Sequence, residues 1–348
     1  MKIAANPHRG QGLTDPALAD IPYPSTAAHR PADLLARCPR AQKTDLIAAP
    51  DLANRLGVAE VNLKDERNRM GLGSFKALGA AYVIARKVSE NPNARETYVT
   101  ASAGNHGLSV AAGAAAFQQK AVIYISEQVP QPFADRITAL GAEDVRSGET
   151  YEASMAEAAQ AAARDGAILL SDSSWQGYVA RPHILMEGYL VLMEEVFADL
   201  TAPPSHIFLQ AGVGGLAGAS AAAARAHWGG GPTIIVVEPE AAPALAASIK
   251  AGRAVETHGP VSAMGRLDCK EPSLIALKGL ARDADFFVTL TEEEGERGAD
   301  IAQEAGFAST PSGAAGLAAL VAASAAPDQL GLSSASRVLA ILSEGPAV

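Results

Sequence analysis

The chain has only two cysteines in 348 residues, Cys38 and Cys269. Their separation offers neither a metal-binding spacing nor a disulfide framework, so we expect a protein of the reducing cytoplasm. The sequence also has no run of about 18 uninterrupted apolar residues, which argues against a membrane-spanning helix. Residues 1–7 lack the apolar segment of a signal peptide.

Positive charge is also scarce, because 28 lysines and arginines face 38 acidic residues, for a net charge of −10. This balance argues against a nucleic acid or an anionic membrane as partner. Hydrophobic residues make up 48% and charged residues 19% of the chain, as in ordinary globular proteins, and the length allows two domains. A single anionic ligand is still compatible with this charge, since backbone amides at a helix N-terminus can hold it locally.

From residue 97 onwards, apolar strands alternate with helical segments. Strands are expected at 58–64, 97–100, 121–125, 143–145, 167–170, 207–209, 233–237, 286–289 and 337–342. Helices are expected at 31–37, 46–57, 132–140, 151–164, 182–197, 242–251, 292–305 and 312–325, and after turns that end near 76, 107 and 216. Apart from the helix at 31–37, residues 1–45 are expected to form an irregular arm, and 252–284 to be largely loop.

This alternation predicts an α/β fold of two domains, each with a mostly parallel, twisted sheet flanked by helices. Four βα units lie between residues 80 and 185. We therefore expect a small inserted domain at 80–185 and a large domain made of 1–79 and 186–348. Ligands of open parallel sheets bind at the carboxyl ends of the strands, so the turns after the strands are the candidate sites.

The first of these turns leads from a strand ending at Lys64 to a helix that begins near Lys76, with Ser74 as its expected cap. Apolar residues follow Lys76 directly. A lysine packed among them loses hydration and its pKa falls, which makes the amine a nucleophile able to form a Schiff base. The alternative is a solvated lysine, although a cation at a helix N-terminus opposes the helix dipole.

The second turn, residues 102–107, offers backbone amides, the hydroxyl of Ser102 and the amide of Asn105 at a helix N-terminus. Such a turn can hold a carboxylate or a phosphate. The alternative is an ordinary capped helix, with Ser102 or Asn105 as the cap. His106 is expected to pack rather than to act as a base. Asp172 follows another strand and is either a turn residue or an acid near the ligand.

The third turn contains three glycines between Gly212 and Gly215, after an apolar strand. Its bare backbone can approach an anion, and the following helix adds its N-terminal dipole. The dinucleotide pattern G-x-G-x-x-G is approached only if Gly218 is counted. Glu238 ends the next strand about 20 residues later, as a ribose-binding acid would. A nicotinamide-dependent oxidoreductase is therefore the alternative from another class.

Taken together, the three turns resemble the fold-type II pyridoxal-phosphate enzymes, the family of threonine dehydratase, threonine synthase and the tryptophan synthase β chain. They read Gly-Ser-Phe-Lys, Ser-Ala-Gly-Asn-His-Gly and Gly-Val-Gly-Gly-Leu, and the resemblance covers residues 40–345. Within the family the chain resembles the diaminopropionate ammonia-lyase branch most. That likeness rests on the stretches Lys64 to Gly79, Asp172 to Tyr178, Gly188-Tyr189 and Met264 to Pro272.

The resemblance implies pyridoxal 5′-phosphate as the cofactor and a role for each matching residue. Lys76 would carry the cofactor, Phe75 would pack near its ring, and Asn105 would hydrogen-bond its 3′-oxygen. Ser343 would face the pyridine nitrogen. The phosphate would be held by Gly212, Val213, Gly214, Gly215 and Leu216. The substrate would be bound by Ser102, Ala103, Gly104 and His106. No metal is implied.

The implied activity is α,β-elimination on a small β-substituted amino acid, giving a 2-oxo acid and ammonia. Freed Lys76 would remove the Cα proton, and either Asp172 or the cofactor phosphate would help the β-group leave. We expect a homodimer. The alternatives are a serine/threonine-type or hydroxyaspartate-type dehydratase, and an idle ligand-binding relative.

Two positions depart from the pattern of the branch. Where the lyases have Asp-Gly-Asn-His, this chain has Ala103, as dehydratases do. The usual Pro-Thr-Pro-Leu is replaced by residues 43–46, Lys-Thr-Asp-Leu. The methyl group of Ala103 can neither accept a proton nor pair with a β-ammonium group. We therefore expect activity on L-configured substrates only and a greater role for hydroxyl-bearing ones.

Overall fold

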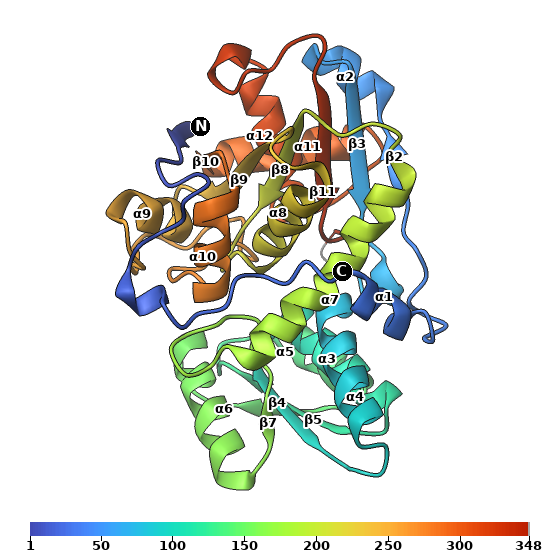
Figure 1. Cartoon of the computed structure of the whole chain (residues 1–348). Helices are drawn as coiled ribbons and strands as arrows, with labels where there is room; N and C mark the ends of the chain where they lie inside the picture. The colour runs from blue at the N-terminus through green and yellow to red at the C-terminus, as the bar shows by residue number, and fades with distance from the viewer. Residues whose placement is uncertain (347–348) are drawn as a thin grey trace.

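The computed structural model describes residues 1–346, which form two lobes, each built around one β-sheet (Figure 1). The seven-stranded sheet has the order β1 (Lys2–Ala5), β10 (Phe286–Leu290), β9 (Thr233–Pro239), β8 (His206–Gln210), β11 (Arg337–Leu342), β3 (Glu60–Asp65), β2 (Leu46–Ala48). The four-stranded sheet has the order β6 (Glu143–Arg146), β5 (Lys120–Ile125), β4 (Thr97–Ala101), β7 (Ile168–Leu169). The four-stranded sheet is parallel throughout, and only the edge strands β1 and β2 of the larger sheet run antiparallel.

Helices cover both sheets and join the two lobes (Figure 1). They are α1 (His29–Leu35), α2 (Pro50–Leu56), α3 (Lys76–Glu90), α4 (Asn105–Ala116), α5 (Gln131–Ala139), α6 (Tyr151–Asp165), α7 (Ala180–Asp199), α8 (Gly215–Trp228), α9 (Ala244–Ala251), α10 (Leu274–Asp283), α11 (Glu292–Glu304) and α12 (Ala315–Ala323). Helix α3 leads from the larger sheet into the smaller lobe, α7 leads back, and the two pack against each other. The segment between them carries the whole four-stranded sheet.

The central strands β8, β9 and β11 of the larger sheet are buried on both faces, as the residues of β11 show. Leu339 and Ile341 lie in a core shared with α8 and α10, whereas Val338 and Ala340 lie in a second core with α11 and α12. Side chains alternate between the faces of a strand, so a strand covered on both sides needs an unbroken apolar run. The predicted parallel sheets with helices on both faces are thereby confirmed.

Three local predictions are wrong or incomplete. The expected helix at 46–57 is the short strand β2 followed by α2, because Pro50 starts the helix and disfavours helical geometry in the residue before it. In the expected loop at 252–284, helix α10 forms, and in the N-terminal arm β1 pairs with the edge strand β10. None of the helices in the part of the chain described is long and apolar enough to cross a membrane.

The expected cap at Ser74 is also not formed. Its hydroxyl is buried and has no hydrogen-bond partner within residues 1–346, and the position before α3 is occupied by Phe75. The backbone of Ser74 instead forms an isolated β-bridge with Glu344. This bridge fixes the start of α3 against the residues that follow β11.

Candidate active site

The three turns singled out in the sequence lie together where the lobes meet. The side-chain nitrogen of Lys76, the first residue of α3, contacts the carboxylate of Asp172, which follows β7. A Cβ built on Gly215 would lie 3.9 Å from the Asp172 carbonyl oxygen. A Cβ built on Gly104 would lie 2.8 Å from Nη1 of Arg266. The first and third turns and Asp172 thus surround one space, and Arg266 links it to the second turn.

Aromatic rings form one wall of this space. Nζ of Lys76 lies 5.4 Å from the centre of the Phe75 ring, and that ring meets the edge of Tyr189 at a centroid distance of 4.9 Å. Tyr189 also approaches the third turn, since its Cε2 lies 3.6 Å from a Cβ built on Gly215. The amine of Lys76 is therefore enclosed by apolar surface on one side and a carboxylate on the other.

The expected fall in the pKa of Lys76 is wrong. Burial alone would lower the pKa of this amine, but the adjacent Asp172 carboxylate outweighs it and raises the pKa above its ordinary value. For Asp172, burial would raise the pKa, but the Lys76 ammonium and nearby His106 hold it well below the usual range. The two groups therefore form an ion pair at neutral pH.

The third turn has the geometry of an anion site. Gly214 has φ of +96°, in the left-handed region that favours glycine, and α8 begins at the next residue. A Cβ on Gly212 would come within 2.9 Å of the sulfur of Cys269. The first N–H groups of α8 have no acceptors within the helix, so they can donate to an anion held by the turn. Val213 and Leu216 complete this backbone cradle.

The second turn is stabilised by a hydrogen bond between its own residues. The hydroxyl of Ser102 accepts a hydrogen bond from the amide of Gly104 at 3.2 Å, and α4 begins at Asn105 without a side-chain cap. A Cβ on Gly107 would collide with the Ser102 carbonyl oxygen, at 2.0 Å, so the turn requires glycine there. The alternative of a helix capped by Ser102 or Asn105 is therefore wrong. Ala103 is half-buried within this turn.

His106 lies inside α4 and is buried. Its Nε2 is 2.7 Å from the carbonyl oxygen of Leu170, and burial lowers its pKa. The interpretation of His106 as a packed histidine agrees with this placement, since its ring is anchored to the chain just before Asp172. Its Nδ1 has no hydrogen-bond partner among the residues described.

Ser343 follows β11 and lies beside the start of α3. Its carbonyl accepts the amide N–H of Phe75 at 3.2 Å. Glu344 contacts the side-chain amide of Asn105 and the hydroxyl of Thr310, and burial raises its pKa. The end of β11 therefore brings Ser343 to Lys76 and Glu344 to the second turn.

Sequence reasoning missed four residues of this site: Tyr189, Arg266, Cys269 and Glu344. The Gly188-Tyr189 pair was a visible signal, and Glu344 comes two residues after a predicted strand. Arg266 and Cys269 lie in a segment without periodicity, and the only signal for them was the resemblance of the stretch Met264 to Pro272. Burial raises the pKa of the Cys269 thiol to about 12, so it stays protonated at neutral pH.

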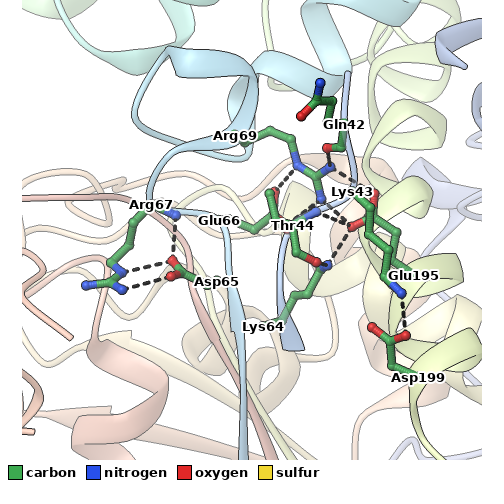
Figure 2. Close-up of polar contacts among 10 residues, drawn as sticks. All are labelled: Gln42, Lys43, Thr44, Lys64, Asp65, Glu66, Arg67, Arg69, Glu195 and Asp199. Atoms are coloured by element: carbon green, nitrogen blue, oxygen red, sulfur yellow. Dashed lines mark hydrogen bonds and ion pairs between the residues drawn. The ribbon is translucent and has the colours of Figure 1, made fainter. Parts of the chain in front are cut away.

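A buried ion cluster holds the loop between β3 and α3 (Figure 2). The guanidinium of Arg69 donates to both carboxylate oxygens of Glu66, at 2.6 and 2.7 Å, and to those of Glu195 in α7, at 2.7 and 2.8 Å. Lys64 donates to Glu195 at 2.5 Å and to the carbonyl oxygen of Thr44 at 2.6 Å. Because this cluster connects the loop to α7, it holds the chain segment that leads to Lys76 in place.

The site fits a phosphorylated aromatic aldehyde such as pyridoxal 5′-phosphate. Lys76 supplies an enclosed amine beside an aromatic wall, and the third turn supplies a helix N-terminus with no room for side chains at Gly212. The hydroxyls of Ser74 and Tyr189 are buried, with no partner in the described part of the chain, so a polar ligand could satisfy them. Within residues 1–346 no cluster of three His, Cys, Asp or Glu side chains is placed to hold a metal ion.

The position of Glu238 argues against the alternative of a dinucleotide-binding oxidoreductase. Its side chain is fully buried, and its two carboxylate oxygens accept the amide N–H groups of Leu245 and Ala246 at 2.7 and 2.8 Å. The acid that would have bound a ribose therefore caps the N-terminus of α9. Burial raises the pKa of Glu238 to about 8.

Comparisons with known proteins agree with this geometry. The family model described as pyridoxal-phosphate dependent enzyme matches residues 39–344. Diaminopropionate ammonia-lyase of Escherichia coli K12 is 31% identical over 334 residues, which cover 87% of this chain and 84% of the relative. L-threonine ammonia-lyase of Geobacter sulfurreducens is 28% identical over 258 residues, 73% of this chain and 60% of the relative.

Solved structures show the same likeness. The crystal structure of Escherichia coli diaminopropionate ammonia-lyase in complex with an aminoacrylate–PLP azomethine reaction intermediate has a TM-score of 0.89 and 29% sequence identity. The match covers 99% of this chain and 93% of that chain. Maize serine racemase, at 20% identity and a TM-score of 0.80 over 92% of this chain and 94% of that chain, shares the fold.

Proposed function

Since the chain belongs to the family of pyridoxal-phosphate-dependent enzymes, we propose that it is an ammonia-lyase acting on a small β-substituted amino acid. The reaction would be α,β-elimination, giving a 2-oxo acid and ammonia. 2,3-Diaminopropionate is the first candidate substrate, because relatives named for that activity match most of the chain. The observation that carries the proposal is the contact between Lys76 and Asp172, since Asp172 also lies next to Gly215 of the third turn.

Lys76 is the proposed attachment point of the cofactor and the base of the reaction. When bound, pyridoxal 5′-phosphate supplies an electron sink for the charge left on Cα after deprotonation. Lys76 would hold the cofactor through Nζ until the substrate amine takes its place, and the freed Nζ would then take the Cα proton. The aromatic wall formed by Phe75 and Tyr189 covers one side of this nitrogen.

Asp172 is the proposed proton donor to the leaving β-group. The low pKa of its carboxyl depends on the charge of Lys76. When Nζ is bonded or neutral, that influence is gone, and burial favours the protonated carboxyl. Asp172 can therefore store a proton given up by Lys76 and deliver it to the departing group. The cofactor phosphate is the alternative donor.

The remaining site residues would position the reactants. The backbone of residues 212–216 would hold the phosphate, Asn105 would contact the 3′-oxygen of the cofactor, and Ser343 would face its ring nitrogen. The second turn would bind the substrate carboxylate through Ser102, Ala103 and Gly104, with His106 behind it. These assignments rest on the matching motifs and on the convergence of the turns described above.

A second candidate function is a dehydratase acting on hydroxyl-bearing amino acids. The observation that favours it is Ala103, which gives the second turn no acidic side chain to pair with a β-ammonium group. Water would then leave in place of ammonia, with Lys76 and Asp172 in the same roles.

We further propose the domain division expected from the sequence, with 80–185 as the small domain and 1–79 with 186–348 as the large one. The composition of the two sheets supports it, because strands β4 to β7 all lie within 80–185. We also propose that the enzyme is a cytoplasmic homodimer. Size-exclusion chromatography with light scattering would measure the oligomeric state.

The proposed function is tested by assay of the purified protein reconstituted with pyridoxal 5′-phosphate. The protein should turn yellow and release ammonia and a 2-oxo acid from at least one of 2,3-diaminopropionate, serine, threonine or 3-hydroxyaspartate. A colourless protein, or a yellow one that releases ammonia from none of them, would contradict the proposal. Tight binding of NAD in the absence of pyridoxal phosphate would instead favour the oxidoreductase.

A further inference from the structure

Arg266 connects the phosphate-binding side of the site with the second turn. Its backbone packs on the third turn, since its carbonyl oxygen lies 3.1 Å from a Cβ built on Gly212. Its amide N–H donates to the hydroxyl of Ser312 at 3.1 Å. Its side chain lies against Gly104, where Nη1, Cζ and Nε are 2.8, 3.1 and 3.5 Å from the position of a built Cβ. Any larger residue at position 104 would displace the guanidinium.

The guanidinium of Arg266 lies beside Gly104, and its donors are not used by the described residues. It makes no hydrogen bond to another side chain or carbonyl within residues 1–346. Its nearest carboxylate oxygen belongs to Glu344, 3.8 Å from Nε, and that carboxylate also contacts Asn105 and Thr310. The Arg266 side chain is 44% exposed, so a small molecule in the site can reach it. A guanidinium fork with free donors is suited to a carboxylate or a phosphate.

The charges around the second turn favour an anion. Residues 102–107 contain no acidic side chain, and the carboxylate of Asp172 is engaged by Lys76. The nearby carboxylate of Glu344 is already engaged by the side chains of Asn105 and Thr310. A cationic β-substituent at this turn would face Arg266 without a free acid to pair with, since Glu344 is already engaged, whereas an anionic one would find a charged donor.

We propose that Arg266 determines substrate specificity by binding a second anionic group, carried on the β-carbon of the amino acid. This inference rests on the proposed function and names its substrate class. Two sources share this chemistry. The anion is either a carboxylate that stays on Cβ, as in 3-hydroxyaspartate, or part of the leaving group, as in O-phosphoserine.

All atoms and electrons are accounted for with both kinds of anionic substrate. With 3-hydroxyaspartate, Lys76 takes the Cα proton, the Cβ–O bond breaks and hydroxide leaves with a proton from Asp172 as water. The released enamine adds water and gives oxaloacetate and ammonia. With O-phosphoserine the Cβ–O bond breaks to release phosphate, and hydrolysis of the enamine gives pyruvate and ammonia. Neither route needs an oxidant or a reductant.

The test compares the holoenzyme with its Arg266→Met variant on four L-substrates: 3-hydroxyaspartate, O-phosphoserine, serine and 2,3-diaminopropionate. We expect kcat/KM for one of the anionic substrates, relative to serine, to fall about 30-fold or more, the effect of one lost charge-assisted contact. The anionic substrate whose kcat/KM falls relative to serine shows whether Arg266 binds a carboxylate on Cβ or a phosphate in the leaving group. Arg266→Lys should restore part of the ratio. Arg253→Met is the matched control, because Arg253 is exposed and its side chain bonds only the Ala254 carbonyl.

A binding measurement separates this inference from the proposed function. L-Aspartate, which has no β-leaving group, should bind the holoenzyme more tightly than L-alanine in calorimetry, and Arg266→Met should remove that preference. If the variant weakens all substrates and both ligands equally, Arg266 binds the common carboxylate or only supports the fold, and the inference is wrong. If no substrate is turned over, the proposed function fails, and the aspartate-to-alanine ratio still decides the role of Arg266.

Discussion

The side-chain nitrogen of Lys76 lies against the carboxylate of Asp172, although 96 positions separate the two residues along the chain. Lys76 begins the helix that leaves the larger sheet, and Asp172 follows the last strand of the smaller sheet. The pair therefore exists only when both lobes are folded and in contact. In the proposed reaction, this pair would supply both the base and the proton donor.

Replacement of Lys76 by alanine should lower turnover at least about 1,000-fold, because both the cofactor attachment and the base are lost. Borohydride reduction of the wild-type holoenzyme followed by peptide mapping should find the cofactor on the peptide that contains Lys76. Lys87, in the same helix but at its far end, is the control residue for replacement. A label on any other lysine would contradict the assignment.

Replacement of Asp172 by asparagine should keep the yellow cofactor but lower turnover about 100-fold or more, since the proton donor is lost. It should also lower the pKa of Lys76, because the carboxylate that raises it is removed while burial, which lowers it, remains. Pyridoxal phosphate reacts only with the neutral amine of Lys76. Because a lower pKa makes the amine neutral at a lower pH, the rate of reconstitution should reach its maximum at a lower pH in the variant.

The control for this variant is Asp165→Asn, whose carboxylate pairs with exposed Arg164 on the surface. It should leave both turnover and the pH dependence of reconstitution unchanged. Unchanged turnover in the Asp172 variant would make Asp172 a turn residue only.

Gly214→Asp should weaken retention of pyridoxal phosphate by at least about tenfold, because it adds a negative charge to the turn that would hold the phosphate. Gly214→Ala separates strain from charge, since a Cβ there would lie 3.0 Å from Ala276 Cβ in a backbone with φ of +96°. Gly252→Ala, with φ of +71° and no atom near its Cβ, controls for strain alone. Full cofactor occupancy in the aspartate variant would show that the turn does not bind phosphate.

Wild-type enzyme should act on L-configured substrates only, because Lys76 reaches one face of the substrate and Ala103 offers no acceptor on the other. Ala103→Asp should raise the rate with D-2,3-diaminopropionate at least about tenfold, provided that the half-buried position accepts the carboxylate. Both enantiomers of diaminopropionate and serine should be assayed. Comparable wild-type rates with D- and L-diaminopropionate would show that another residue supplies the second base.

Glu195→Gln should lower the free energy of unfolding by about 3–5 kcal/mol, because Lys64 and Arg69 would be left buried without their shared carboxylate. Burial would raise the pKa of Glu195, but hydrogen bonds from Arg69 and Lys64 outweigh it and lower the pKa. A carboxyl with a lowered folded-state pKa contributes stability above its unfolded value of about 4.5, and that contribution is lost as pH falls.

Chemical denaturation at several pH values measures this effect. The difference between wild type and Glu195→Gln should be largest at neutral pH and should shrink below about pH 4.5. Glu304→Gln removes an exposed ion pair with Arg55 and should cost less than about 0.5 kcal/mol. Equal effects of the two substitutions would show that the cluster adds nothing beyond a surface pair.

The three turns could be predicted from the sequence because each joins a clear apolar strand to a helix, and strand ends of parallel sheets are ligand sites. The raised pKa of Lys76 could not be predicted from the sequence, because it depends on Asp172, which belongs to the other lobe. Arg266 was missed for a similar reason, since its segment has no periodicity and only packing between lobes places it on Gly104. Ser74 was misjudged because local capping rules do not include the β-bridge to Glu344.

Strand β11, near the end of the chain, lies between β8 and β3 and is hydrogen-bonded to both. On the ribosome, β3 therefore has only the three-residue strand β2 beside it until residues 337–342 have been made. The loop that carries Lys76 is anchored to residues 343 and 344, which emerge later still. Chains that stop before residue 337 would thus lack an organised reaction centre, and the nascent larger sheet would leave the edges of β3 and β8 unpaired until β11 is made.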